Sequence, residues 1–377
     1  MNIVAQLFCS DRLPKFGQQT ALKWETGSWT YTELTNHIQL NSIELRKIGI
    51  EFGDRVVFRC SDTAQFVAMY LAVINIGAVA VAVSTRFSDE ELGSVIEDSN
   101  ATAFVYDSGG QNRFLHQRNA MPAKLAPIKL KQGVIGDNKN LPLETISRSA
   151  SDECLWVYSS GSTSRPKGIV HTHRNISDCC HFHTDTLKII PGDTIFCTSR
   201  LSFAYALANG LLAPLMIGAT VYLHPEWVTI PEVYRIIVTE SPKVVFSVPT
   251  IYRGLLDKLE SAEFGCLSVV DHYVSAGEHL PSQIQDAWFR AVGKSIINVY
   301  GCSETLFLAL AGNSDQTPLE SVGMPLPGVK AVLADRDSES ADNSEYAVLR
   351  ISHPFMFKFY ANRALSLIHI SEPTRPY

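Results

Sequence analysis

Helix-like and strand-like segments alternate along this chain in two separate series, and this alternation constrains the fold more than any other feature. In the first series, strand-like runs at 55–60, 78–83 and 102–106 alternate with helix-like segments that begin at 30, 64 and 88. In the second series, helix-like segments at 207–217, 230–240, 249–259 and 281–292 alternate with strand-like runs at 219–223, 243–248, 272–275 and 296–300. Such an order is typical of parallel sheets that carry helices on both faces.

The sequence therefore predicts an α/β fold with two similar doubly wound subdomains. Ile76-Gly77-Ala78 and Ile217-Gly218-Ala219 stand at the same helix-to-strand junction in the two series, although a shared glycine C-cap alone can give this echo. Residues 107–150 are polar and poorly patterned, so we expect a long connection with some irregular strand. Short strand-like runs at 330–334 and 347–351 predict a smaller β subdomain after Pro318.

Charge and cysteine usage narrow the class of protein. The net charge of −6 argues against a broad nucleic-acid footprint. The eight cysteines show no CxxC spacing and the N-terminus has no signal-peptide pattern, so we expect a reduced, cytoplasmic chain. The stretch from Ala64 to Val83 has no charged residue, but Asn75 and Gly77 interrupt it. We interpret it as a buried helix, a glycine cap and a buried strand rather than a membrane span.

A loop rich in hydroxyls and glycines follows the apolar run 154–158. It runs from Tyr158 to Gly168 and reads Tyr-Ser-Ser-Gly-Ser-Thr-Ser-Arg-Pro-Lys-Gly. It is not a Walker A motif, because that motif needs Gly-Lys-Ser/Thr at the start of a helix. Backbone N–H groups, hydroxyls and one ammonium group together are suited to hold a polyphosphate. The alternative is a polar hairpin without a binding role.

This loop resembles the signature loop of the adenylate-forming superfamily, which includes acyl- and aryl-CoA ligases, luciferases and nonribosomal adenylation domains. It departs from that pattern at Ser159, where threonine is usual, and at Ser164, where glycine is usual. A serine held at positive φ costs about 1 kcal/mol or more, which puts nucleotide affinity or loop closure in question. The resemblance implies phosphate-binding roles for Ser160, Gly161, Ser162, Thr163 and Lys167. It also implies catalytic roles for Thr163 and Lys167, with Thr163 beside the metal.

Further blocks match the family in order. Ser275-Ala276-Gly277-Glu278 resembles the adenine-side segment, and 321–328 and 346–360 resemble two later blocks. The run Asn298-Val-Tyr300-Gly301-Cys-Ser303-Glu304 resembles the Tyr-Gly-x-Thr-Glu block.

By the resemblance of this last block, Tyr300 flanks adenine, Ser303 faces the phosphates and Glu304 holds Mg²⁺ as a catalytic residue. A carboxylate beside a triphosphate makes sense only through a hard cation. Taken singly, these residues also fit a strand end, a turn and a solvated helix start. The nucleotide-binding candidates from these blocks are Ala276, Gly277, Glu278, Asn298, Tyr300, Gly301 and Ser303.

Residues 202–210, Ser-Phe-Ala-Tyr-Ala-Leu-Ala-Asn-Gly, are similar to the acyl-pocket segment of benzoate- and hydroxybenzoate-CoA ligases. The resemblance implies that Phe203, Ala204 and Tyr205 line the substrate pocket, where aromatic rings stack on a flat ring. Plain core packing is the alternative. Ala206 and Ala208 stand where that subgroup tends to carry glycine, so the added methyl groups narrow the pocket or tighten a helix contact.

Histidine and cysteine patterns elsewhere suggest little chemistry. His171 with His173, and His181 with His183, are spaced i, i+2 without a supporting carboxylate or cysteine pattern, which disfavours a metal site. We expect His171 and His173, which follow the loop, near the nucleotide. Cys302 has no paired base in the sequence and is interpreted as a small buried residue rather than a nucleophile.

The resemblance implies ATP-dependent activation of a carboxylic acid, benzoate-like by the 202–210 segment, to an acyl-AMP, followed by thioester formation with coenzyme A. The cofactors would be ATP/AMP, Mg²⁺ and CoA. Three alternatives stay open. They are a fatty acyl-CoA ligase, a carrier-protein-loading adenylation domain, and a nucleotide-binding protein without turnover.

The last residues, 365–377, fit no element and resemble the translation of a sequencing-library adapter, the alternative being an ordinary extended terminus. We therefore expect an AMP-binding N-terminal domain over 1–364 that is incomplete at its C-terminal end. The ribose-binding Asp and the small C-terminal domain with its lysine, which the family uses, would then lie in a longer parent protein. On this interpretation the chain is a fragment with weak activity at best.

Overall fold

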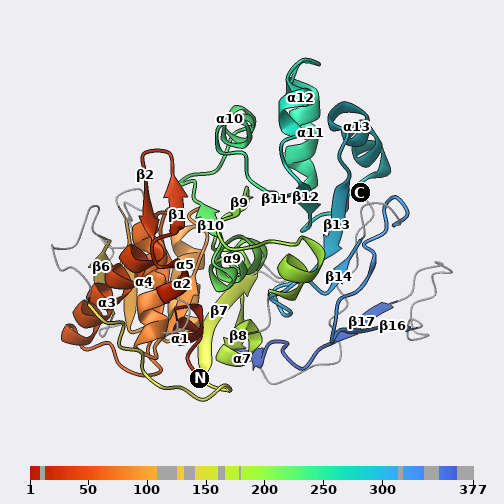
Figure 1. Ribbon diagram of the computed structural model, residues 1–377. Helices are drawn as coiled ribbons and strands as arrows, with labels where there is room; N and C mark the ends of the chain where they lie inside the picture. Colours follow the sequence, from red (N-terminus) through yellow and green to blue (C-terminus); the bar gives the residue numbers. More distant parts are fainter. Residues whose placement is uncertain are drawn as a thin grey trace.

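A computed structural model of the chain describes residues 1–8, 13–107, 125–130, 141–159, 166–177, 180–312, 317–334 and 348–362. The predicted tail at 365–377 and parts of the 107–150 connection lie outside these residues. The described strands form two large sheets and one separate hairpin. Figure 1 shows the two sheets side by side, with the hairpin at the lower right.

The first sheet holds the first predicted series. Its seven strands lie in the order β18-β8-β7-β4-β3-β5-β6. They are β3 (Arg55–Arg59), β4 (Val79–Ala82), β5 (Ala103–Tyr106), β6 (Ala126–Lys129), β7 (Glu153–Ser159), β8 (Lys167–Thr172) and β18 (Phe359–Tyr360). Strands β3 to β7 run parallel, and β8 runs antiparallel to both of its neighbours.

The second sheet holds the second series and an N-terminal hairpin. Its nine strands lie in the order β15-β14-β13-β12-β11-β9-β10-β1-β2. They are β1 (Thr20–Trp24), β2 (Gly27–Thr30), β9 (Thr194–Cys197), β10 (Thr220–Tyr222), β11 (Val244–Ser247), β12 (His272–Ser275), β13 (Ile296–Tyr300), β14 (Leu310–Ala311) and β15 (Met324–Pro325). The sequence pattern did not predict the β1–β2 hairpin, which crosses from the start of the chain to pair with β10.

Helices cover both faces of each sheet, as predicted. On the first sheet, α4 (Ala64–Asn75) packs on one face and α5 (Asp89–Asp98) on the other, while α3 (Tyr31–Lys47) packs against α4 and the β1–β2 hairpin. On the second sheet, α10 (Ile230–Glu240), α11 (Pro249–Lys258), α12 (Phe264–Leu267) and α13 (Ser282–Val292) cover one face, at the top of Figure 1. The π-helical turn η3 (Phe182–Thr186) packs on the opposite face. Three further short helices are α1 (Ile3–Leu7), α2 (Leu13–Phe16) and α7 (His173–Ile176).

Local sequence signals place several of these boundaries. Thr30 and Ser88 each form the predicted capping box, in which the hydroxyl accepts an N–H of the first turn and a glutamate accepts the cap N–H. Gly77 and Gly218 both adopt positive φ, +84° and +93°. The Ile-Gly-Ala sequence that the two series share is therefore the same left-handed helix end in both. The uncharged 64–83 stretch is α4 followed by β4. Among the described residues, no helix is long and apolar enough to cross a membrane.

The predicted helix at 207–217 is a three-part element and begins earlier. It consists of α8 (Ala204–Ala206), the π-helical turn η4 (Leu207–Leu212) and α9 (Ala213–Ile217). The π turn is fixed from both sides, because the Asn209 amide donates to the Tyr205 carbonyl at 2.9 Å and His183 Nε2 lies 3.0 Å from the Asn209 carbonyl. Such turns widen a helix locally and are frequent at functional sites. The predicted smaller β unit is the antiparallel pair β16 (Lys330–Ala334) and β17 (Val348–Ser352).

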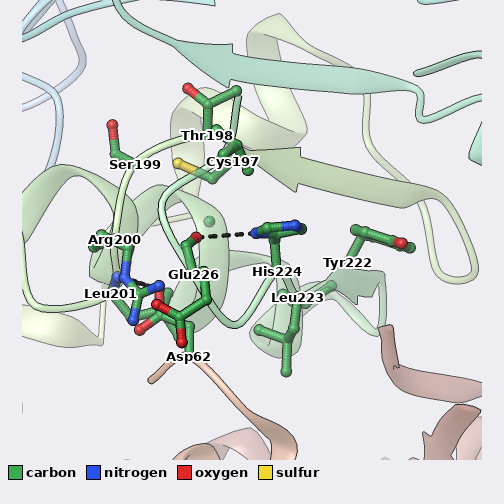
Figure 2. A pocket seen from close by; sticks show the side chains of 13 residues that line it. Asp62, Cys197, Thr198, Ser199, Arg200, Leu201, Tyr222, Leu223, His224 and Glu226 are labelled. Carbon is green, nitrogen blue, oxygen red and sulfur yellow. Dashed lines mark hydrogen bonds and ion pairs between the residues drawn. The ribbon is translucent and has the colours of Figure 1, made fainter. Parts of the chain in front are cut away.

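A buried ion pair joins the two sheets. Asp62 follows β3 of the first sheet, and its Oδ2 lies 3.2 Å from Nε of Arg200, which follows β9 of the second. The two side chains are 8% and 4% exposed. The same Oδ2 accepts the Leu201 N–H at 3.0 Å, so one carboxylate fixes both side chain and backbone of the 200–201 segment. Figure 2 shows these groups around a small cavity beside Glu226 and His224.

Candidate functional site

Polar side chains line the carboxyl ends of the parallel strands in the second sheet. Ser247 and Ser275 end β11 and β12, and Asn298 of β13 lies in register with them, two residues before that strand ends. Thr198, just beyond β9, shares a 2.8 Å hydrogen bond with the Ser247 hydroxyl. The Ser275 hydroxyl is fully buried and has no hydrogen-bond partner in the described part of the chain. In open α/β sheets, ligands bind outside this edge.

The adenine-side candidates lie at this same edge. Ala276, Gly277 and Glu278 follow β12 directly, and Gly277 has a φ of +84°, which favours glycine. The Thr250 hydroxyl donates to the Glu278 carboxylate at 2.8 Å, which holds it against the start of α11. The Asn298 amide donates to the Ser321 carbonyl at 3.1 Å and so ties the 321–328 segment to β13.

The turn at 300–304 continues from β13. Tyr300 ends the strand, and a Cβ at Gly301 would come within 3.0 Å of the Phe307 carbonyl oxygen, so the turn has little room for a side chain there. The Ser303 carbonyl lies 2.8 Å from Nε2 of His171. The Tyr360 hydroxyl donates to Glu304 Oε1 at 2.7 Å. Two residues of the first sheet therefore hold this turn of the second sheet.

Strands β7 and β8 present the phosphate-loop candidates. Ser159 and Lys167 form the pair at the open end of this hairpin. The candidates Ser160, Gly161, Ser162 and Thr163, and also Ser164, lie outside the described residues. Lys167 and His171 share a face of β8, and Tyr360 joins that face because it pairs with Ile169. Lys167 therefore stands on the face of β8 from which His171 and Tyr360 contact the turn that carries Glu304.

Burial sets the protonation of the groups around this turn. Burial lowers the pKa of His171 to about 4, so its imidazole is neutral at pH 7 and Nε2–H donates to the Ser303 carbonyl. Burial, with Glu304 nearby, raises the pKa of Cys302 to about 11, which leaves a thiol rather than a nucleophilic thiolate. His173 does not join His171 at the site, because its Nδ1 accepts the Ile3 N–H at 3.1 Å instead.

The acyl-segment candidates separate into two environments. Tyr205 lies below the strand ends, with its hydroxyl 3.4 Å from the Ser247 and Val274 carbonyl oxygens. Ala204 is buried beside it in α8. Phe203 is 44% exposed, and its ring lies edge-on to Trp227 at 6.1 Å between centroids. The geometry thus favours Tyr205 over Phe203 as a wall of the site.

Sequence reasoning did not find the contacts by which His171 and Tyr360 hold the 300–304 turn. Tyr360 belongs to a two-residue strand without periodicity, and its role depends on β18 reaching β8 from almost 200 residues later in the chain. His171 was noted as a neighbour of the loop, but no local signal pointed to the Ser303 carbonyl. In the described ranges, no cluster of three or more His, Cys, Asp or Glu side chains could hold a metal ion.

Known proteins resemble this chain over nearly its whole length. The 3-hydroxybenzoate–CoA/4-hydroxybenzoate–CoA ligase of Thauera aromatica is 32% identical over 352 residues, which cover 89% of this chain and 66% of that protein. The 3-hydroxybenzoate–CoA ligase of Aromatoleum sp. (strain CIB) is 31% identical over 379 residues, covering 96% and 71%. The chain therefore spans just under two thirds of the Thauera relative and somewhat more of the second.

A solved structure supports the architecture. The benzoate CoA ligase of Burkholderia xenovorans LB400 superposes with a TM-score of 0.83 at 26% identity, covering 96% of this chain and 73% of that one. The sequence model of the family described as AMP-binding enzyme matches residues 9–361, which include the β7–β8 hairpin, the strand-end row and the 300–304 turn. By this match and by its relatives, the chain belongs to the AMP-binding enzyme family, which is the adenylate-forming superfamily that its motifs resemble.

Proposed function

We propose that this chain carries the ATP and acid sites of an acid–thiol ligase, which converts an aryl carboxylic acid to its adenylate and then to a CoA thioester. One observation carries the proposal. The turn with Glu304 is tied to the strand with Lys167 through the His171–Ser303 and Tyr360–Glu304 hydrogen bonds. A carboxylate and an ammonium group on two elements that are tied together in this way suit a bound magnesium–triphosphate.

The adenylation step needs positioning and charge neutralisation more than proton transfer. An oxygen of the acid attacks the α-phosphorus of ATP, a new O–P bond forms, and the bond to the bridging oxygen breaks to release pyrophosphate. Lys167 would offset charge on the phosphates, together with the hydroxyls of Ser160, Ser162 and Thr163 and the backbone at Gly161. Tyr300, Gly301 and Ser303, with the 276–278 segment and Asn298, would bound the nucleotide along the strand ends. In the second step the thiol of CoA displaces AMP from the adenylate.

The residues present fit a magnesium ion held mainly by its substrate. Mg²⁺ is usually bound by one or two carboxylates and substrate phosphates rather than by a full protein cage. Glu304 supplies one carboxylate, and Tyr360 orients it by donating to Oε1. The ion would neutralise phosphate charge, and Thr163 is the second candidate ligand.

Acid-dependent ATP–pyrophosphate exchange, measured on this chain, tests the proposal. We expect exchange with benzoate and 3-hydroxybenzoate to exceed exchange with hexanoate and dodecanoate. The reverse order would select a fatty acyl-CoA ligase. Tight ATP binding without exchange would select a nucleotide-binding protein without turnover. Transfer to a phosphopantetheinyl carrier but not to CoA would select a carrier-loading domain.

Tyr205 and Phe203 should differ in their effect on acid binding. Replacing Tyr205 with alanine removes a ring from beneath the strand ends, so we expect the KM for benzoate to rise about tenfold or more, as loss of an aromatic contact worth about 1.5 kcal/mol implies. Phe203→Ala should change it less than threefold, because that ring lies against Trp227. Benzoate kinetics of both variants make the comparison. If the two variants changed the KM for benzoate equally, Tyr205 would not be part of the proposed pocket wall.

His171 should act by holding the 300–304 turn rather than by proton transfer. His171→Leu leaves the Ser303 carbonyl without its donor, so we expect the KM for ATP to rise about five- to tenfold, as loss of a hydrogen bond of about 1 kcal/mol implies. His171→Gln keeps a side-chain N–H, so its KM for ATP should lie between those of the parent and of His171→Leu. Because the pKa of His171 is about 4, the pH profile above pH 6 should be the same in all three proteins. A lost ionisation between pH 6 and 8 in either variant would contradict this role.

A further inference from the structure

A cavity of about 140 Å³ opens at the side of the molecule away from the candidate site. It lies between α3, the start of α4, strand β2 and strand β6. Strand β6 is the edge of the first sheet and β2 is the edge of the second, so the cavity sits where the two sheets meet at their far edges. Figure 1 shows α3 and β6 at the left, with β8 and β13 toward the centre and right.

The strand order separates this cavity from the nucleotide site in both sheets. Five strand spacings lie between β8 and β6, and six lie between β13 and β2. At about 4.8 Å for each spacing, these separations are roughly 24 Å and 29 Å. None of the nucleotide or acid candidates lines the cavity. A molecule bound here would not touch ATP or the acid.

The walls combine a flat aromatic surface with apolar side chains. The ring of Trp29 stacks on His37 with 3.9 Å between centroids and 14° between planes. Leu45, Met69 and Leu130 are part of the apolar lining, and the charged residues Glu44 and Lys129 also border the cavity. Burial lowers the pKa of His37, with only partial opposition from Glu33, so this stack is uncharged at neutral pH. Such a surface favours a planar, uncharged ring.

One polar residue in the cavity wall, Asn41, indicates that the ligand carries a polar group as well as an apolar ring. Asn41, one helical turn after His37 on α3, lines the cavity and is only 3% exposed. The structure gives its amide no hydrogen-bond partner among the described residues, whereas the neighbouring Gln39 accepts the Glu144 N–H at 3.0 Å. The Asn41 amide atoms are not among the fully buried unpaired ones, so they keep contact with the cavity's solvent, which a polar group of a ligand can replace. A ligand hydroxyl or amide at Asn41 would satisfy the group.

We propose that this cavity is a second small-molecule site, which binds a single aromatic ring carrying one uncharged hydrogen-bonding substituent. The volume supports one ring, since an engineered cavity of about 150 Å³ holds benzene. The ring packs against Trp29 and Met69 and its substituent reaches Asn41. Because β2 belongs to one sheet and β6 to the other, the ligand bridges the two subdomains.

Binding at Trp29 tests this site without interference from the acid pocket. The full chain is labelled with 5-fluorotryptophan, the Trp29 resonance among the five tryptophans is assigned with Trp29→Phe, and phenol and toluene are titrated by fluorine NMR. We expect phenol to shift the Trp29 resonance saturably and to bind more tightly than toluene, which has the same ring without the hydroxyl. Asn41→Leu should weaken phenol binding about tenfold and leave toluene binding within twofold.

Ala68→Leu serves as a second variant, because Ala68 lines the cavity from α4 and the added carbons fill it. It should abolish the Trp29 shift with both probes while leaving acid-dependent exchange unchanged. The proposal is overturned if phenol causes no saturable shift at Trp29 in the parent chain. It is equally overturned if phenol binds Asn41→Leu as tightly as the parent, since Asn41 would then contribute nothing. If Asn41→Leu does not fold, the test rests on Ala68→Leu. Loss of the Trp29 shift in that variant supports the proposal, and a shift as large as in the parent overturns it.

Discussion

Replacing Glu304 with glutamine is expected to weaken the binding of MgATP about a hundredfold. Glutamine keeps the shape of the side chain and an oxygen for the Tyr360 hydroxyl, but it removes the charge that a hard cation needs. The magnitude is the upper end of what losing a group around a bound metal costs. Isothermal titration with MgATP measures it without requiring turnover.

Two controls separate the metal role of Glu304 from general damage to the turn. In EDTA, where ATP carries no magnesium, the parent and Glu304→Gln should bind ATP within threefold of each other. Tyr360→Phe keeps the carboxylate but removes its 2.7 Å donor, and should weaken MgATP binding about tenfold. If Glu304→Gln bound MgATP as tightly as the parent, Glu304 would have no part in the metal site.

Replacing Arg200 with methionine should lower the free energy of unfolding by about 3 kcal/mol at pH 8. The change leaves the Asp62 carboxylate buried without its partner, and breaking a buried pair in this way costs about 3–5 kcal/mol. Arg235→Met is the matched control, because its pair with Glu25 is 41% and 68% exposed and should contribute less than about 1 kcal/mol. Urea unfolding of both variants gives the comparison.

The decrease in the free energy of unfolding that Arg200→Met causes should become smaller as the pH falls. Burial raises the pKa of Asp62 from 3.8 to about 7, against the attraction of Arg200 and with repulsion from Glu226 and Asp107. A raised folded pKa means that the native state binds the proton more tightly, so this group's contribution to stability falls as pH rises from about 4 to 7. At pH 5.5 Asp62 is protonated in both proteins, and the remaining cost comes mainly from the lost Arg200 bonds to the Pro225 and Cys60 carbonyls. A cost that stayed the same from pH 5.5 to 8 would contradict this.

Local patterns predicted most of the elements, because burial and capping leave a periodic trace. The helix Ile230–Glu240 and the strands His272–Ser275, Ile296–Tyr300 and Lys330–Ala334 have the predicted bounds. The hairpin of β1 and β2 was missed because it pairs with a strand about 200 residues away, and nothing in 20–30 encodes that partner. The π turn η4 was missed because it depends on His183 and Tyr205 contacts rather than on periodicity.

The candidate site was predicted from motifs, but its assembly was not. The strand-end positions of Gly277 and Asn298 follow from where the motifs stand along the chain. The placement of Lys167 on the same face of β8 as the residues that contact the Glu304 turn depends on the antiparallel ladder from β8 to β18, and a two-residue strand gives no recognisable sequence signal. The hydrogen bonds from His171 and Tyr360 belong to tertiary structure and became visible only with the fold.

The most direct test of the nucleotide site is a crystal structure of this chain with magnesium and a non-hydrolysable ATP analogue. We predict the triphosphate between the open end of the β7–β8 hairpin and the 300–304 turn, with the ammonium of Lys167 on a phosphate and the magnesium ion on Glu304. A nucleotide bound elsewhere, or one bound between these elements that neither residue contacts, would contradict the proposed function.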